Sequence, residues 1–224
     1  MLNLKLSPTN QVSSTTHARQ RLLSGSHTQI MVNHFLIDLD TNLSAKHTCD
    51  QHVNRMILET CQLLYTAWHV NANELPAVKE SEPQPYKKTH TNHPTAIWTR
   101  AHENNYNHMV AYAFALNKEA IARYPDRKVE HKCMQHLRRL QSWGYPKKEK
   151  QEPIVKKRKR KETIYASVDL PEGLTKIPLC MPQEFIVKKG DCYSALKSYR
   201  KYYRSKELTM KRGMTWKRNK PTWF

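Results

Sequence analysis

One stretch near the start of the chain constrains the fold more than any other feature. From about Thr48 to Val70, apolar residues return every three or four positions, which is the pattern of an α-helix with one buried stripe. The chain has only 5 glycines and few runs of alternating polarity, both of which argue against a sheet-based domain. The predicted fold is therefore mainly α, a compact single-domain helical fold with long loops.

The same period predicts three further helices, at 94–124, 128–143 and 191–204. Pro94 suits the first turn of the first of these. Residues 71–93 contain three prolines and many polar groups, so they are expected to form a long loop. The segment TIYASVDL, residues 163–170, is the one short extended piece that we expect between the third and the last helix.

The fold is predicted to begin near Met31. Residues 1–30 are rich in Ser and Thr without a sustained period, which indicates a flexible N-terminal extension. The segment MVNHFLIDLD, from Met31 to Asp40, is apolar and resembles the start of a folded domain. We therefore expect a single domain over 31–224, with Met31 as a second candidate start of translation.

The balance of charge points to a polyanionic partner. The chain has 38 Lys and Arg against 19 acidic residues, a formal net charge of +19. Such an excess favours nucleic acid through phosphate neutralisation and counterion release. A dense basic run lies at 147–162 and is expected to be an exposed arm. Its nucleic-acid-binding candidates are Lys156, Lys157, Arg158, Lys159 and Arg160.

The sequence disfavours several classes of protein: membrane-spanning, secreted and disulfide-stabilised. No run approaches the ~18 apolar residues of a membrane-spanning helix, and no apolar signal segment precedes a cleavage site. The five cysteines are odd in number and scattered, which argues against a disulfide framework. We expect a monomer without a membrane partner in a reducing compartment, the cytoplasm (of the host if the protein is viral) or the nucleus if that host is eukaryotic.

The polar edge of the first helix is the main candidate site. His52, Arg55, Glu59 and Gln62 follow steps of three and four, as does Thr66, so they share one helix face. A solvated face would also give this pattern. Against that reading, the edge lacks lysines in a lysine-rich chain, and its residues are of the kinds that transfer protons and bind phosphate.

A second candidate lies before the helix expected at 94–124. His90, Asn92 and His93 gather there, where backbone N–H groups and the helix dipole favour a phosphate. Ordinary capping of the helix by Asn92 is the alternative. Near the C-terminus, aromatic residues alternate with basic ones in a pattern that suits backbone clamping and base stacking, although core packing of the same rings would look alike. The basic candidates there are Arg200, Arg204, Lys217 and Arg218.

Two strings share the spacing His-x-Cys-x-x-His, at 47–52 and at 131–136. Cys and His are the usual ligands of zinc. Positions i and i+2 of a helix point in different directions, however, and neither string has a standard pair spacing. We therefore predict core or surface histidines here, no metal and no cofactor.

Four segments, taken in order, resemble one protein family: the small α-helical pyrimidine-dimer DNA glycosylase/AP lyases of bacteriophage, of the endonuclease V type. The similarity covers about 31–224, apart from a basic region at about 145–176 that finds no counterpart in the family and therefore looks like an inserted loop. The segments are Asp50-Gln51-His52 with Glu59 seven residues on; Asn92-His93-Pro94-Thr95 with Trp98; Met181-Pro182-Gln183-Glu184-Phe185 with Gly190-Asp191; and Lys220-Pro221-Thr222-Trp223-Phe224.

The resemblance implies a DNA-repair enzyme that acts on double-stranded DNA with damaged or modified bases. In that family an N-terminal α-amine attacks C1′ of the nucleotide, displaces the base through a Schiff base, and β-elimination then cuts the strand. By this analogy Glu59 relays protons and stabilises the cationic sugar, His52 lies beside it, and Arg55 binds a flanking phosphate. The amine would belong to Val32 or Met31.

Two departures keep alternatives open. Leu58 and Gln62 stand where the family has arginines. Met1 lies far before the expected start of the fold, so a start at Met1 would favour a glycosylase that uses water or a lysine instead. A DNA base-modifying enzyme on a related fold, and a noncatalytic nucleic-acid-binding protein, are the remaining alternatives.

Overall fold

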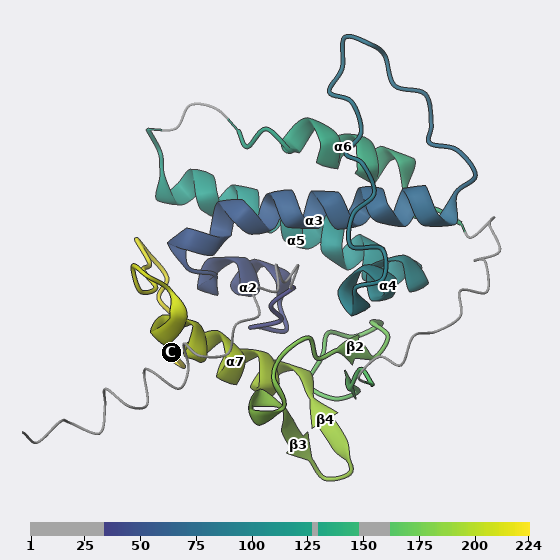
Figure 1. Cartoon of the computed structure of the whole chain (residues 1–224). Coiled ribbons are helices and arrows are strands. Elements are labelled where there is room, and N and C mark those ends of the chain that lie inside the picture. The colour runs from purple at the N-terminus through teal and green to yellow at the C-terminus, as the bar shows by residue number, and fades with distance from the viewer. Residues whose placement is uncertain (1–33, 127–129, 148–161) are drawn as a thin grey trace, which may run out of the picture.

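The computed structural model describes residues 34–126, 130–147 and 162–224, and within them the fold is mainly α, as expected (Figure 1). The buried apolar side chains form one hydrophobic cluster. The helices are α2 (Thr41–His47), α3 (Asp50–Asn71), α4 (Pro94–Ala101), α5 (Glu103–Arg123), α6 (Met134–Trp143) and α7 (Ala195–Thr209). The short elements are β1 (Tyr165–Ala166), β2 (Ile177–Pro178), the 3₁₀ turn η1 (Gln183–Phe185), β3 (Val187–Lys189) and β4 (Cys192–Ser194).

The helix α3 is the centre of the fold. It runs alongside α5, with α6 on one side of the pair and α2 and α4 on the other, while α7 and the short strands form a second layer (Figure 1). The predicted stripe is buried: Val53, Ile57 and Leu64 are fully enclosed. Burial of such a side chain contributes roughly 1.5–3 kcal/mol, so packing of the stripe holds α3 in place. The loop expected at 71–93 begins one residue later, after Asn71 ends α3, and residues 72–93 contain no helix or strand.

The single helix expected at 94–124 is wrong, because the chain breaks at His102. This residue is extended (φ −153°, ψ 144°), and its ring accepts the Asn104 N–H to cap α5. The break is held by buried Asn105, whose side-chain amide donates to the Trp98 carbonyl at 2.8 Å and to the Thr175 hydroxyl at 2.7 Å. A continuous helix would use the Trp98 carbonyl itself and would leave Asn105 without these partners.

Other helix bounds also differ from the sequence expectation. The helix expected at 128–143 begins only at Met134, and α2 was not foreseen. The helix expected at 191–204 begins at Ala195 because residues 192–194 pair with β3 in an antiparallel hairpin. Ser194 then caps α7, which extends to Thr209. The extended piece expected at 163–170 is confirmed only at residues 165–166, which form β1 and pair with β2; strands β2, β3 and β4 were not expected.

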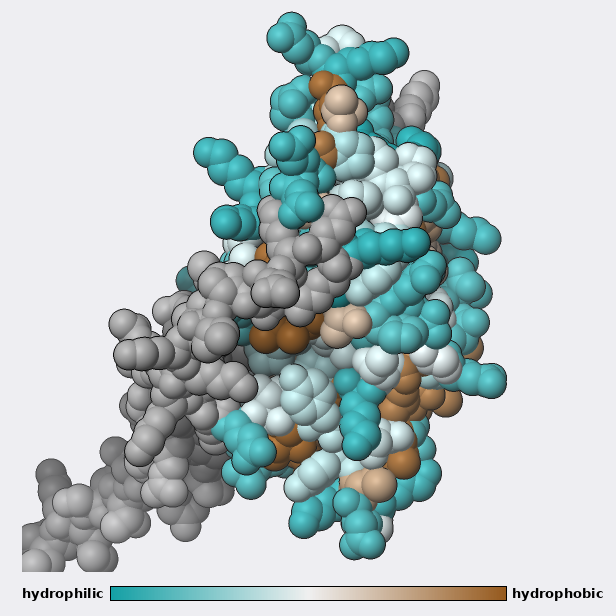
Figure 2. Space-filling view, turned by 90° about the vertical axis from the view of Figure 1, so that its right-hand side faces the viewer, coloured by the Kyte–Doolittle hydropathy of each residue, from teal (hydrophilic) through white to brown (hydrophobic). Residues whose placement is uncertain are grey.

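The surface is predominantly hydrophilic on the face drawn in Figure 2, where the coloured apolar side chains lie in small separate groups. Among the described residues, no helix combines the length and apolarity needed to cross a bilayer. The five cysteines are all free thiols. The N-terminal extension 1–30 and most of the basic run lie outside the described residues.

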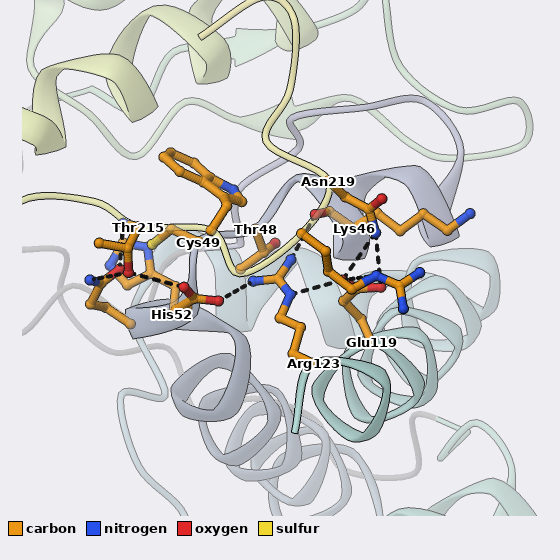
Figure 3. Close-up of polar contacts among 12 residues, drawn as sticks. Lys46, Thr48, Cys49, His52, Glu119, Arg123, Thr215 and Asn219 are labelled. Carbon is orange, nitrogen blue, oxygen red and sulfur yellow. Dashed lines mark hydrogen bonds and ion pairs between the residues drawn. The ribbon is translucent and has the colours of Figure 1, made fainter. Parts of the chain in front are cut away.

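A buried ionic network joins three parts of the chain around Arg123, the last residue of α5 (Figure 3). Its guanidinium donates to Asp50 Oδ1 at 3.0 Å, to Glu119 Oε1 at 2.8 Å and to the Lys46 carbonyl at 2.7 Å. The C-terminal segment completes the network, because the Thr215 hydroxyl donates to Asp50 Oδ2 at 3.0 Å. The N-terminus of α3 is thereby fixed to both α5 and residues near the C-terminus.

Candidate functional site

The polar edge of α3 lines a cavity of about 920 Å³. His52, Arg55 and Glu59 form one wall, and His93 at the start of α4 adjoins them. The opposite wall comes from the second layer, through residues 179–183 and the C-terminal half of α7. The cavity therefore lies where the two layers of the fold meet, and it contains side chains from segments more than a hundred residues apart in sequence.

Glu59 is the acidic residue on the α3 wall. Its carboxylate side chain is only 12% exposed, and Oε1 accepts a hydrogen bond from Arg55 Nε at 2.7 Å. The two residues are one helical turn apart, a spacing that brings side chains together. The guanidinium of Arg55 is 62% exposed, so it holds the carboxylate from the solvent side while remaining accessible to an anion. A carboxylate in this position can stabilise positive charge on a bound molecule.

His52 is a neutral imidazole in this structure near pH 7. Burial, together with the positive charges of Lys206 and Arg55, lowers its pKa to about 4. Its ring stacks on Phe35 at 5.5 Å between centroids, and Nδ1 lies 3.2 Å from the Tyr203 hydroxyl. That hydroxyl also accepts the Cys49 backbone N–H at 2.9 Å. His52 is therefore fixed in orientation and can exchange a hydrogen bond without carrying charge.

His93 has a different role from the one that the sequence suggested. It is itself the N-cap of α4, with its ring Nδ1 accepting the Thr95 N–H at 3.3 Å, so the expectation of capping by Asn92 is wrong. Because the ring occupies an orphan N–H of the helix, the proposed phosphate site there is partly filled from within. Burial also lowers the pKa of His93. His90, with a φ of 48°, bonds to Thr89 and does not line the cavity, nor does Asn92.

Lys206 on the opposite wall is a residue that the sequence did not single out. Its Nζ lies 4.3 Å from the ring centroid of Tyr202, and burial lowers its pKa. Both residues line the cavity, as do Met181, Pro182 and Gln183. The signal for Lys206 was the spacing of four residues from Tyr202, which puts both on one face of a helix. That signal was lost because the last helix was expected to end at residue 204.

The remaining candidate residues lie away from the cavity. Gln62 is half-buried on α3 but is not among the lining residues. Arg200 pairs with Asp38 at 2.9 Å and, together with Arg204, lies over the ring of Trp223. Val32 and the basic candidates Lys156, Lys157, Arg158, Lys159 and Arg160 lie outside the described residues.

Two further C-terminal cations hold the fold together. Lys217 Nζ lies 4.4 Å from the ring centroid of Tyr124, and Arg218 lies 3.6 Å from Glu119. The aromatic rings of α7 serve packing to a large extent, because Tyr199, Tyr202 and Tyr203 are buried. The alternation of aromatic and basic residues near the C-terminus therefore reflects core packing at these tyrosines, while Lys217 and Arg218 contact residues of α5 and its C-cap.

The two His-x-Cys-x-x-His strings are spread over packed helix ends. In the second string, His136 Nδ1 lies 2.9 Å from the Tyr65 hydroxyl, and Cys133 Sγ lies 3.6 Å from that of Tyr86. Within residues 34–126, 130–147 and 162–224, no group of three or more His, Cys, Asp and Glu side chains is arranged to hold a metal ion.

The cavity thus brings together a carboxylate, a neutral imidazole, a guanidinium and a lysine amine. These groups can stabilise a cationic transition state, transfer protons and bind a phosphate. Comparison with protein-family models, curated proteins and solved structures gave no match.

Proposed function

We propose that this chain is a DNA glycosylase of the base-excision type, which removes a damaged or modified base from double-stranded DNA and cleaves the strand at the abasic site that results. The observation that carries the proposal is the cavity of about 920 Å³ with Glu59 held by Arg55 on its wall. Ligand cavities of roughly 300–1,000 Å³ hold a molecule of drug size, so a nucleotide displaced from the duplex fits within this volume.

The side chains suit the chemistry of base removal. Breaking the bond between sugar and base builds positive charge at C1′, which the carboxylate of Glu59 would stabilise. The neutral imidazole of His52 would exchange a hydrogen bond with the leaving base. The exposed guanidinium of Arg55 would bind a phosphate beside the displaced nucleotide. The net charge of +19 supports duplex binding by counterion release.

The positions of the resembling segments also support a glycosylase of the endonuclease V type. His52 and Glu59, His93, and the segment 181–183 come from three of the four motifs, and all of them line the one cavity. In the fourth motif, Trp223 packs near Tyr203 and His47 instead. A nucleophile at Val32 stays a hypothesis: Phe35 lines the cavity, and the three residue-to-residue steps from Val32 to Phe35 span at most about 10 Å.

One observation favours a second function, modification of a DNA base. The cavity is at the upper end of the usual range of ligand volumes, so a displaced base leaves room for a second reactant. Leu58 packs against the core and Gln62 lies off the cavity, so neither replaces the phosphate-binding arginines of the resembling family. A base-modifying enzyme would still need Glu59 and a displaced base.

The test is a substitution of Glu59→Gln, which keeps the shape of the side chain and removes its charge. Duplexes carrying one thymine dimer, one uracil or one hydroxymethylated pyrimidine are incubated with each variant, and released bases are identified by mass spectrometry. A glycosylase should lose about 100-fold or more in the rate of base release, with duplex affinity unchanged. Glu130→Gln is the matched control. Glu130 forms an exposed ion pair with Arg138, with 2.6 Å between the charged atoms, and it does not line the cavity.

The outcomes separate the functions. Base release that Glu59→Gln leaves unchanged refutes the proposed role of the carboxylate. Altered nucleosides in the digested duplex, without base release, support the base-modifying enzyme. Duplex binding without either product from any substrate supports a noncatalytic binding protein, whose affinity Glu59→Gln should not change.

A further inference from the structure

We infer that Lys206 is the amine that bonds covalently to the sugar of an abasic site bound in the cavity, an inference that rests on the proposed glycosylase function. The substrate class is an aldehyde, namely the ring-opened deoxyribose left after a base has been removed. Lys206 would therefore supply the strand-cleaving step.

The position of Lys206 carries the inference. Among the described residues, it is the one lysine whose side chain lines the cavity, although the chain is rich in lysine. It projects from α7, so it belongs to the wall opposite Glu59 and Arg55 of α3. The positive charge of Lys206 contributes to the lowered pKa of His52 on the α3 wall. An aldehyde between the two walls would meet the amine on one side and the carboxylate on the other.

The surroundings of Lys206 also favour an unprotonated amine. Its Nζ lies against the Tyr202 ring, 4.3 Å from the centroid, and it is half-buried, which lowers its pKa. Withdrawal from water disfavours the ammonium form. No ion pair of Lys206 with a carboxylate is found in the described part of the chain. Lysines in such settings act as imine-forming nucleophiles.

The chemical step needs no oxidant and no cofactor. The lone pair of Nζ attacks C1′ of the aldehyde, and a C–N bond forms. The aldehyde oxygen takes two protons, one of them from the amine, and leaves as water, which gives the protonated imine. A base then removes a proton from C2′, the C3′–O bond breaks, and the 3′ phosphate leaves with that electron pair. Water hydrolyses the imine, which releases the unsaturated aldehyde and restores Lys206.

The experiment traps the imine in the full-length protein. A labelled duplex with one abasic site is mixed with the protein and sodium borohydride, which reduces the imine to a stable secondary amine. Trypsin does not cleave after an alkylated lysine, so an adduct on Lys206 appears on the peptide Ser205–Lys211. Lys206→Met keeps the apolar stem on Tyr202, and Lys206→Arg keeps the charge without the nucleophile. Lys201→Met is the control on the same helix, because Lys201 bonds to the Glu184 carbonyl outside the cavity.

The result expected is an adduct on Ser205–Lys211 that both Lys206 variants abolish and Lys201→Met retains, with all variants folded by circular dichroism. An adduct on an N-terminal peptide, or one of undiminished yield in Lys206→Met, overturns the assignment and leaves the glycosylase proposal standing. Base release from a damaged duplex without any adduct also overturns it, because the enzyme would then use water. The absence of base release, adduct and Glu59-dependent chemistry together refutes both proposals.

Discussion

Replacing Arg123 with Met should destabilise the protein more than removing any exposed cation. The Arg123 side chain is fully enclosed, and its partners Asp50 and Glu119 are only 11% and 5% exposed. Its removal leaves two carboxylates buried without their main partner, and breaking a buried ion pair typically costs about 3–5 kcal/mol. Met fills a comparable volume, so the loss measures charge and hydrogen bonding more than a cavity.

The magnitude should fall toward the lower end of that range. Asn219 Nδ2 donates to Glu119 at 3.2 Å, and Arg218 lies 3.6 Å from it, so Glu119 keeps some compensation. Asp50 keeps the bond from the Thr215 hydroxyl. With a total stability of roughly 5–15 kcal/mol, a loss of about 3 kcal/mol would remove a fifth or more of it.

Urea unfolding followed by circular dichroism measures the effect. At a slope of about 1–3 kcal/mol per molar urea, the midpoint should fall by about 1–3 M. Arg138→Met provides the control, because its ion pair with Glu130 is about half exposed on both sides and such pairs contribute about 0–1 kcal/mol. Equal midpoints for the two variants would refute the idea that the buried network fixes the N-terminus of α3.

Two further predictions concern buried polar groups. The Nε2 atoms of His34 and His108 lie 3.0 Å apart, and burial lowers the pKa of His108 to about 4. Because His108 binds its proton more tightly in the unfolded chain, the free energy of unfolding should be highest above about pH 6.5. It should fall by up to about 3 kcal/mol toward pH 4. Urea midpoints measured across this pH range should slope less in His108→Gln, and an unchanged slope would contradict the reasoning. Tyr203→Phe removes the hydroxyl that accepts the Cys49 N–H and contacts His52, so the free energy of unfolding should fall by about 1–3 kcal/mol. A variant that unfolds at the same temperature as the wild type would show the reasoning wrong.

The sequence was sufficient to predict α3 because its signal is local. Burial of one face repeats every three or four residues, and residues 53 to 68 carry that repeat without interruption. The shared face of His52, Arg55 and Glu59 follows from the same geometry. The break at His102 could not be predicted this way, because the amide of Asn105 is engaged by Thr175, about seventy residues further along the chain.

The second wall of the cavity was beyond local reasoning for the same reason. The packing of α7 opposite α3 depends on contacts such as that of Tyr203 with Cys49 across 154 residues. Lys206 looks like any other lysine of a basic helix until that packing gives it a half-buried position. His93 lines the cavity, but its ring caps the helix itself, which a pattern of residue types does not reveal.

The link between Thr215 and the start of α3 also has a consequence for the newly made chain. Thr215 and Asp50 are 165 residues apart, and ribosomes add about 5–20 residues per second, so the start of α3 is made roughly 10–30 s before the segment that braces it. During that interval Asp50 lacks the hydroxyl that completes its hydrogen bonds, and Arg123 emerges only partway through. The α3 wall of the cavity should therefore gain this brace only after residue 215 has left the ribosome.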